Sequence, residues 1–147
     1  MALIQVHDKS FEPFIAAAEI REQIQRLGKQ LNEDYQGKKP LFIAILNGSF
    51  MFASDLFKEL TIEAEICFIK LASYKGTRST GQVITSIGLD ASLHDRHVVI
   101  LEDIVDTGKT LSDFLPQLAS QHPASLKIAA FLHKPEAQVH PLTVDYV

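Results

Sequence analysis

Residues 98–110 read VVILEDIVDTGKT, and the predicted architecture follows from this stretch. Its first four residues are all apolar, which is typical of a strand covered on both faces in a parallel sheet. Two adjacent acids, Glu102 and Asp103, come next, and a hydroxyl-rich turn at 107–110 opens a helix that should reach about Ser120. The stretch therefore predicts a buried strand that ends in acids and leads through a polar turn into a helix.

Other parts of the chain repeat this alternation of buried strands and helices. Strands are expected at 41–46, 65–71, 82–87 and 128–132, and residues 144–147 are expected to begin another. Helices between buried strands imply right-handed crossovers, so we predict an α/β protein with a central, mostly parallel twisted sheet flanked by helices. No repeat or linker interrupts the sequence, and we expect residues 1–147 to form a single domain.

Two helices are expected around the strand at 41–46. The first has its apolar stripe at Ile20, Ile24, Leu27 and Leu31. Ser10 is expected to cap this helix, which should end near Gly37. The second should open at Ser49 or a neighbour, after a tight turn at 47–49. Because ligands collect at the carboxyl ends of parallel strands, the polar residues after the strands should open onto one crevice.

Composition argues against several classes of function. Fourteen basic and eighteen acidic residues leave a net charge of −4, and the basic residues are scattered, so no nucleic acid partner is expected. The longest apolar run has six residues, far short of the ~20 that cross a bilayer, so no membrane is expected either. Cys67 is the only cysteine. Without a disulfide or a recognisable signal peptide, the chain is expected to be cytoplasmic.

Residues 106–110 have the composition of a phosphate-binding turn. Gly108 permits a sharp bend, Thr107 and Thr110 supply hydroxyl groups, and the first amides of the following helix favour an anion. The Gly-Lys-Thr ending suggests a nucleoside triphosphate loop. That motif needs a glycine five positions before Gly108, where this chain has Asp103, so we reject this interpretation.

A ribose 5-phosphate would use both the phosphate turn and the acids beside it. Glu102 and Asp103 can accept hydrogen bonds from the 2- and 3-hydroxyl groups of the sugar. Their negative field also favours positive charge at the anomeric carbon in a transition state resembling an oxocarbenium ion. A strand end with solvated acids and a capped helix is the alternative interpretation, and the thirteen-residue combination favours the sugar phosphate.

The stretch 102–110 resembles the phosphoribosyl pyrophosphate motif of the type I phosphoribosyltransferases, in the form found in the hypoxanthine-guanine branch. The segments ILNGSFMF at 45–52 and SYKGTRSTG at 73–81 are also similar to that branch, and the similarity extends through essentially the whole chain. The resemblance implies purine salvage. A 5-phosphoribosyl group would pass from phosphoribosyl pyrophosphate to N9 of hypoxanthine or guanine, in a homodimer or homotetramer.

The resemblance also implies roles for the residues of the central motif. Glu102 and Asp103 would hold the ribose hydroxyl groups, directly or through Mg2+. Asp106 would lie beside N7 of the purine as the general acid and base. The implied 5-phosphate site consists of Asp106, Thr107, Gly108, Lys109 and Thr110.

Two other loops gain implied roles in binding pyrophosphate. Leu46, Asn47 and Gly48 match a loop in which a non-proline cis peptide turns an amide toward the leaving group. Ser73 and Tyr74 match the start of a loop that folds over the substrates. Without the resemblance, an ordinary strand-to-helix turn and a plain hairpin connection would be the simpler interpretations.

Lys134 matches a lysine that contacts the exocyclic oxygen of the purine. Because an ammonium group only donates hydrogen bonds, it favours a 6-oxopurine over adenine. Relatives usually continue past the position of Val147, so we expect the C-terminal segment that covers the base to be absent. A xanthine-preferring sister transferase and a non-catalytic sensor of phosphoribosyl pyrophosphate are the alternatives that stay open.

Overall fold

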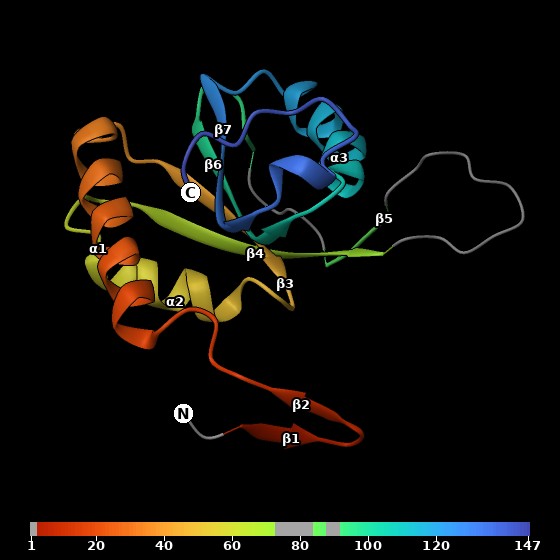
Figure 1. Cartoon of the computed structure of the whole chain (residues 1–147). Coiled ribbons are helices and arrows are strands. Elements are labelled where there is room, and N and C mark those ends of the chain that lie inside the picture. The colour runs from red at the N-terminus through yellow and green to blue at the C-terminus, as the bar shows by residue number, and fades with distance from the viewer. Residues whose placement is uncertain (1–2, 73–83, 88–91) are drawn as a thin grey trace, which may run out of the picture.

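The computed structural model describes residues 3–72, 84–87 and 92–147, and a five-stranded sheet lies at its centre (Figure 1). The strands are β3 (Leu41–Leu46), β4 (Glu65–Ala72), β5 (Ile84–Ile87), β6 (His97–Val105) and β7 (Ser125–His133). They lie in the order β5-β4-β3-β6-β7, and all pair in parallel except β5, which is antiparallel to β4. The predicted fold class is confirmed.

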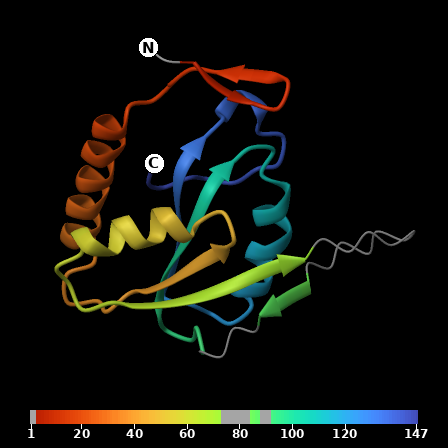
Figure 2. The same ribbon diagram turned by 90° about the horizontal axis from the view of Figure 1, so that it is seen from below.

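Helices cover both faces of this sheet (Figure 2). The helices are α1 (Ala17–Asp34), α2 (Phe50–Glu59), α3 (Lys109–Ala119) and the short 3-10 helix η1 (Pro135–Ala137). Phe42 and Val99 pack with α1 and α2, whereas Ile43 and Ile100 pack with α3 on the other face. Neighbouring residues of β3 and β6 thus enter two different cores, which is why these strands lack polar alternation.

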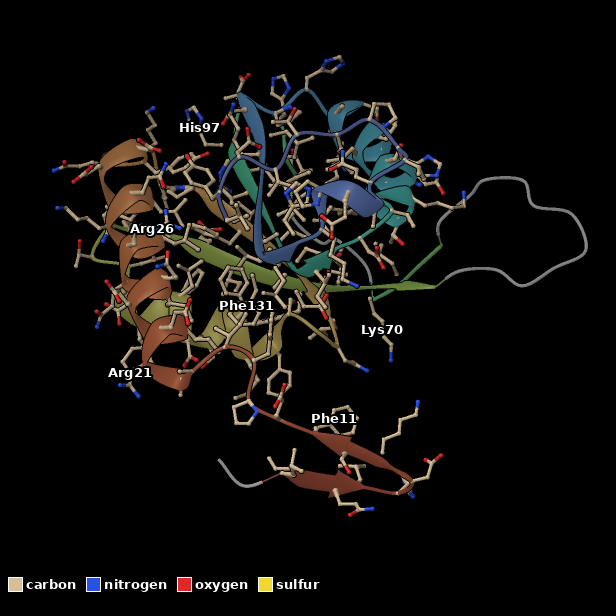
Figure 3. The ribbon with its side chains drawn as sticks, in the orientation of Figure 1. Phe11, Arg21, Arg26, Lys70, His97 and Phe131 are labelled. Carbon is tan, nitrogen blue, oxygen red and sulfur yellow. The ribbon has the colours of Figure 1, made fainter. Side chains whose placement is uncertain are left out.

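The N-terminal prediction was only partly correct. The apolar stripe is confirmed, because Ile24, Leu27 and Leu31 are buried. Ser10 does not cap the helix. It lies in β2 (Lys9–Phe11), which pairs with β1 (Ile4–Val6), and α1 begins only at Ala17. This hairpin stands apart from the sheet, and the Phe11 side chain is half exposed (Figure 3).

Two strand boundaries also differ from the prediction. β6 does not end before the acids but continues to Val105, because β7 pairs with it as far as Val105 and His133. Residues 144–147 form no strand, only an isolated bridge between Ala129 and Tyr146. Tyr146 exchanges backbone hydrogen bonds with Ile128 and Ala130 of β7, and its hydroxyl donates to Asp34 at 2.8 Å.

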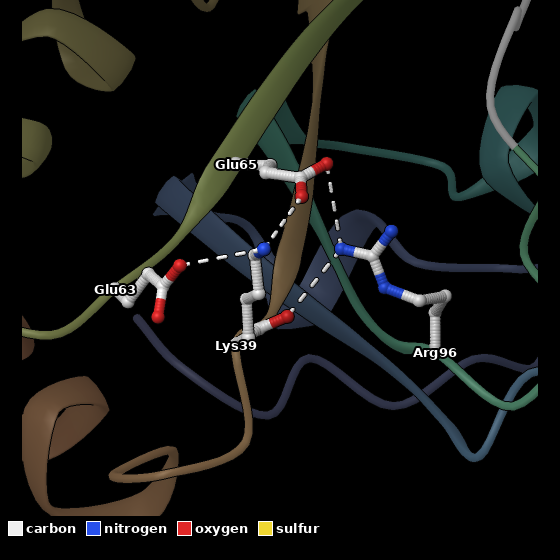
Figure 4. A network of polar contacts seen from close by, with 4 residues as sticks. All are labelled: Lys39, Glu63, Glu65 and Arg96. Atoms are coloured by element: carbon white, nitrogen blue, oxygen red, sulfur yellow. Dashed lines mark hydrogen bonds and ion pairs between the residues drawn. The ribbon is translucent and has the colours of Figure 1, made fainter.

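Charged residues join the amino ends of the central strands (Figure 4). Lys39 Nζ lies 3.3 Å from Glu63 and 3.6 Å from Glu65, and Arg96 lies 3.5 Å from Glu65. These pairs are largely exposed, so each contributes little to stability. This edge of the sheet is therefore occupied by structural contacts. Among the described residues, no helix is long and apolar enough to span a membrane.

We expect Leu56→Ala to destabilise the fold. The Leu56 side chain is fully buried between α2 and the sheet, and its truncation should lower the free energy of unfolding by about 2–5 kcal/mol. Urea denaturation measures this loss. Met51→Ala on the same helix is the control, because Met51 is 61% exposed and should change stability by less than about 0.5 kcal/mol. Equal losses would contradict the described packing of α2.

Candidate active site

Loops that follow β3, β6 and β7 meet at the carboxyl edge of the sheet. The backbone N–H of Lys134, just after β7, donates to the carbonyl of Val105 at the end of β6, at 2.9 Å. Gly48, after β3, lies against the carboxylate of Asp103 in β6. The structure therefore brings together the three polar clusters that the sequence places after buried strands.

The turn after β3 is shaped by its backbone. The peptide bond between Leu46 and Asn47 is cis, as the resemblance implies. Ser49 is fully buried at the start of α2, and its hydroxyl donates to the Ile45 carbonyl at 2.6 Å. The hydroxyl thus closes the turn instead of capping the helix. Asn47 and Gly48 remain exposed.

Gly48 and Asp103 form a contact that no larger residue at position 48 would permit. A Cβ atom added to Gly48 would overlap the Asp103 carboxylate. That carboxylate also accepts the N–H of Ile104 at 2.8 Å. The loop after β3 is therefore held against the acidic part of β6, and glycine is required by this close approach.

Glu102 is buried although it is an acid, with 9% of its surface exposed. Its carboxylate accepts the Asp103 N–H at 3.0 Å. Burial, reinforced by a hydrogen bond with the Asp103 side chain, raises the pKa of Glu102 to about 8, while the Asp103 N–H opposes this shift. Burial of this carboxyl group thus favours its protonated form.

A cavity of about 100 Å3 lies beside Glu102 and beneath the turn that opens α3. Its lining consists of Glu102 and residues 104–111. Gly108 precedes α3 with a φ of 82°, a left-handed conformation that glycine adopts without strain. The free N–H groups of the first turn of α3 make such a cavity favourable for an anion.

The side chains of this turn differ in their contacts. Thr107 Oγ1 accepts the Lys109 N–H at 3.3 Å. The Lys109 ammonium group pairs with Asp113 at 3.0 Å, one helical turn away. Asp106, Thr107, Lys109 and Thr110 are exposed. The Lys109 side chain is thus held along α3, and its backbone N–H is engaged by Thr107.

Sequence reasoning missed the segment 138–142, which packs against this turn. The N–H groups of Val139 and His140 donate to the Thr107 carbonyl, each at 3.1 Å. The Leu142 side chain lies beside Gly108, where an added Cβ would approach it to 2.9 Å. Pro135 and Pro141 mark this stretch as irregular, but nothing in the sequence indicates what it contacts.

The remaining predicted site residues are the side chain of Lys134 and the pair Ser73 and Tyr74. The Lys134 side chain is exposed beside the end of β6. Ser73 and Tyr74 lie outside the residues that the structure describes.

The donor set of Glu102 and Asp103 fits Mg2+. Within residues 3–72, 84–87 and 92–147, no group of three or more His, Cys, Asp or Glu residues could hold a metal ion by itself. Mg2+ is commonly held by one or two carboxylates together with substrate oxygens. Two adjacent carboxyl groups at the end of β6 are suited to such shared binding.

Comparisons with known proteins agree with this geometry. Residues 16–147 match the model of the phosphoribosyl transferase domain. A hypoxanthine-guanine phosphoribosyltransferase of Streptococcus pneumoniae is 39% identical over 129 residues, which are 87% of this chain and 72% of that protein. A hypoxanthine phosphoribosyltransferase of Buchnera aphidicola is 38% identical, over 90% of this chain and 77% of that protein.

A solved structure gives the same result. The crystal structure of a hypoxanthine-guanine phosphoribosyltransferase from Bacillus anthracis superposes with a TM-score of 0.85 at 32% identity, covering 93% of this chain and 79% of that one. The chain therefore belongs to the phosphoribosyl transferase domain family.

We expect Gly48→Ala to impair phosphoribosyl transfer, because the new methyl group would displace the Asp103 carboxylate. The overpacking should also cost about 1–3 kcal/mol of stability, measurable by denaturant unfolding. Gly37→Ala is the control. Gly37 has a φ of 75° with nothing within 4 Å of an added Cβ. The Gly37→Ala variant should therefore lose stability but keep the wild-type transfer rate. If Gly48→Ala kept the wild-type rate, the contact would have no functional role.

Proposed function

We propose that this protein is a purine salvage enzyme that transfers a 5-phosphoribosyl group from phosphoribosyl pyrophosphate to N9 of hypoxanthine or guanine. The observation that carries the proposal is the cavity lined by Glu102 and residues 104–111, where acids adjoin a helix N-terminus. Relatives named for hypoxanthine, at 38–39% identity, support this choice of purine over xanthine. They also favour an enzyme over a non-catalytic sensor.

In this proposal the ribose phosphate is held at two points. The backbone amides and hydroxyl groups of residues 106–110 bind the 5-phosphate at the start of α3. Glu102 and Asp103 accept hydrogen bonds from the ribose hydroxyl groups, directly or through Mg2+. Bound Mg2+ supplies positive charge that favours departure of pyrophosphate. The two carboxylates also stabilise positive charge at the anomeric carbon.

The pyrophosphate and the base occupy the other loops. Leu46, Asn47 and Gly48 present backbone amides to the leaving group, and Ser73 and Tyr74 complete its binding. As the bond from the anomeric carbon to the pyrophosphate oxygen breaks, N9 of the purine forms its bond to that carbon. The base site proposed at the carboxyl edge consists of Asp106 and Lys134. Asp106 accepts the proton from N7, and the Lys134 ammonium group contacts the exocyclic oxygen.

Cytoplasmic location and a homodimer or homotetramer complete the proposal. Several large apolar side chains are exposed, which supports association with a further copy. They include Ile4, Val6, Phe11, Phe14 and Phe50.

The proposal is tested by mixing the protein with phosphoribosyl pyrophosphate, Mg2+ and hypoxanthine, guanine, xanthine or adenine. We expect nucleotide and pyrophosphate to form with hypoxanthine or guanine, as followed by absorbance and by a pyrophosphate-release assay. Sugar binding without product for any purine would contradict the enzymatic proposal. Faster reaction with xanthine or adenine would overturn the proposed specificity.

Asp106→Asn should slow the chemical step, because an amide cannot accept the N7 proton. The loss should be about 100-fold to 10,000-fold in single-turnover rate, with little change in the affinity for phosphoribosyl pyrophosphate. Rapid-quench measurements separate the two quantities. Asp55→Asn, an acid-to-amide change on α2 that breaks an exposed pair with Lys58, should leave the rate unchanged. A wild-type rate in Asp106→Asn would remove the role assigned to Asp106.

Lys134→Gln should weaken discrimination between purines. An amide can accept a hydrogen bond from the 6-amino group of adenine, whereas an ammonium group cannot. The ratio of kcat/KM for hypoxanthine to that for adenine should fall at least about tenfold. Lys127→Gln on β7, where the lysine pairs with Asp145, is the matched control. An unchanged ratio in Lys134→Gln would exclude Lys134 from the base site.

A further inference from the structure

The Thr107 carbonyl receives two hydrogen bonds from outside the proposed phosphate site. Val139 N–H and His140 N–H both donate to it at 3.1 Å, and neither residue lines the cavity. A carbonyl oxygen has two lone pairs, and both are engaged here. The carbonyl is thus held toward the segment 138–142. A carbonyl turned into the cavity would repel an anion.

The orientation of this carbonyl determines where the next amide points. A trans peptide unit is planar, so the Thr107 C=O and the Gly108 N–H point in opposite directions. Holding the carbonyl toward Val139 and His140 directs the Gly108 N–H to the other side of the loop. Thr107, Gly108 and Lys109 line the cavity, and an inward amide there is the group that would bind a phosphate oxygen.

The side chain of Gln138 closes the turn that supplies these two donors. Its Nε2 donates to the carbonyl of His140 at 3.1 Å and to that of Leu142 at 2.8 Å. Both bonds require the NH2 group, so the opposite end of the amide is Oε1. His133 Nε2, at the end of β7, lies 2.9 Å from Oε1 and is therefore the donor.

The same turn also makes an apolar contact with the loop. The Leu142 side chain packs beside Gly108, and the His140 carbonyl would lie 3.2 Å from a Cβ added there. Gln138 holds the carbonyls of both His140 and Leu142. One half-buried amide side chain thus fixes the polar and the apolar contacts on the outer side of the loop.

We propose that Gln138, held by His133, is a positioning residue that orients the peptide plane between Thr107 and Gly108 for binding of the 5-phosphate. The proposal rests on the function proposed above and adds a residue outside the cavity to it. Gln138 touches neither the sugar phosphate nor the base. It acts through the backbone of residues 139–142.

The test compares Gln138→Ala and Gln138→Glu with the wild-type protein. Both variants remove the NH2 group. The carboxylate of Gln138→Glu also repels the carbonyls of His140 and Leu142, while it can still accept a hydrogen bond from His133. Both should raise the KM for phosphoribosyl pyrophosphate about tenfold, the usual value of one hydrogen bond to a charged group. The KM for the purine should stay within about twofold. Isothermal titration with ribose 5-phosphate should show the same loss in Kd.

Controls separate positioning from general destabilisation. Gln25→Ala, at an exposed position of α1, should match the wild type in every measurement. His133→Ala should shift the KM for phosphoribosyl pyrophosphate in the same direction as Gln138→Ala but by less. Thermal unfolding of each variant shows whether the protein is folded at the assay temperature.

The outcomes distinguish this proposal from the function on which it rests. Wild-type protein that forms no nucleotide and binds no ribose 5-phosphate would overturn the proposed function. Active wild-type protein together with an unchanged KM in both Gln138 variants would overturn the positioning role alone. A lower unfolding temperature with equal losses for both substrates would show that Gln138 is merely structural.

Discussion

The position of β6 between β3 and β7 is the constraint on which the site depends. β6 pairs in parallel with both neighbours, so all three strands leave the sheet at the same edge. Because β3 and β6 are buried on both faces, their register cannot slip without moving apolar side chains out of a core. The loops after these strands are thus held at fixed separations by the buried centre of the sheet.

The acidic side chains and the free backbone amides at this edge of the sheet belong to different segments of the chain. The acids belong to the end of β6 itself, where strand pairing holds them in place. The amides that we propose to bind the phosphate belong to the turn beyond the strand, where α3 begins. The proposed phosphate site thus lies a few residues away from carboxylates that would otherwise repel the anion. Burial of Glu102 in the acidic part raises its pKa to about 8.

Sequence patterns predicted the buried parts of this structure better than its exposed parts. The runs at 41–46 and 128–132 indicated strands because burial on both faces leaves an unbroken apolar signature. The hairpin of β1 and β2 left no comparable signature, since its residues are exposed and its turn uses His7 at positive φ without a glycine. The acids of β6 suggested a strand end, but pairing with β7 extends the strand through them.

The candidate site, too, was predicted only in part from the sequence. Glu102 and residues 106–110 adjoin in sequence, so their shared cavity followed from one motif. The approach of segment 138–142 to Thr107 joins residues about a quarter of the chain apart, and its polar contacts involve backbone groups that every residue possesses. Periodicity and motifs cannot report such contacts. Only the path of the chain after β7 determines them.

The close packing of Gly48 against Asp103 has a consequence for altering this protein. Because one position has no side chain and the other fills the space left free, neither can be enlarged alone. Mutant libraries that vary the two loops one at a time would miss combinations in which a smaller residue replaces Asp103 and makes room for a side chain at position 48. We expect functional variants at this edge only when positions 48 and 103 are randomised together.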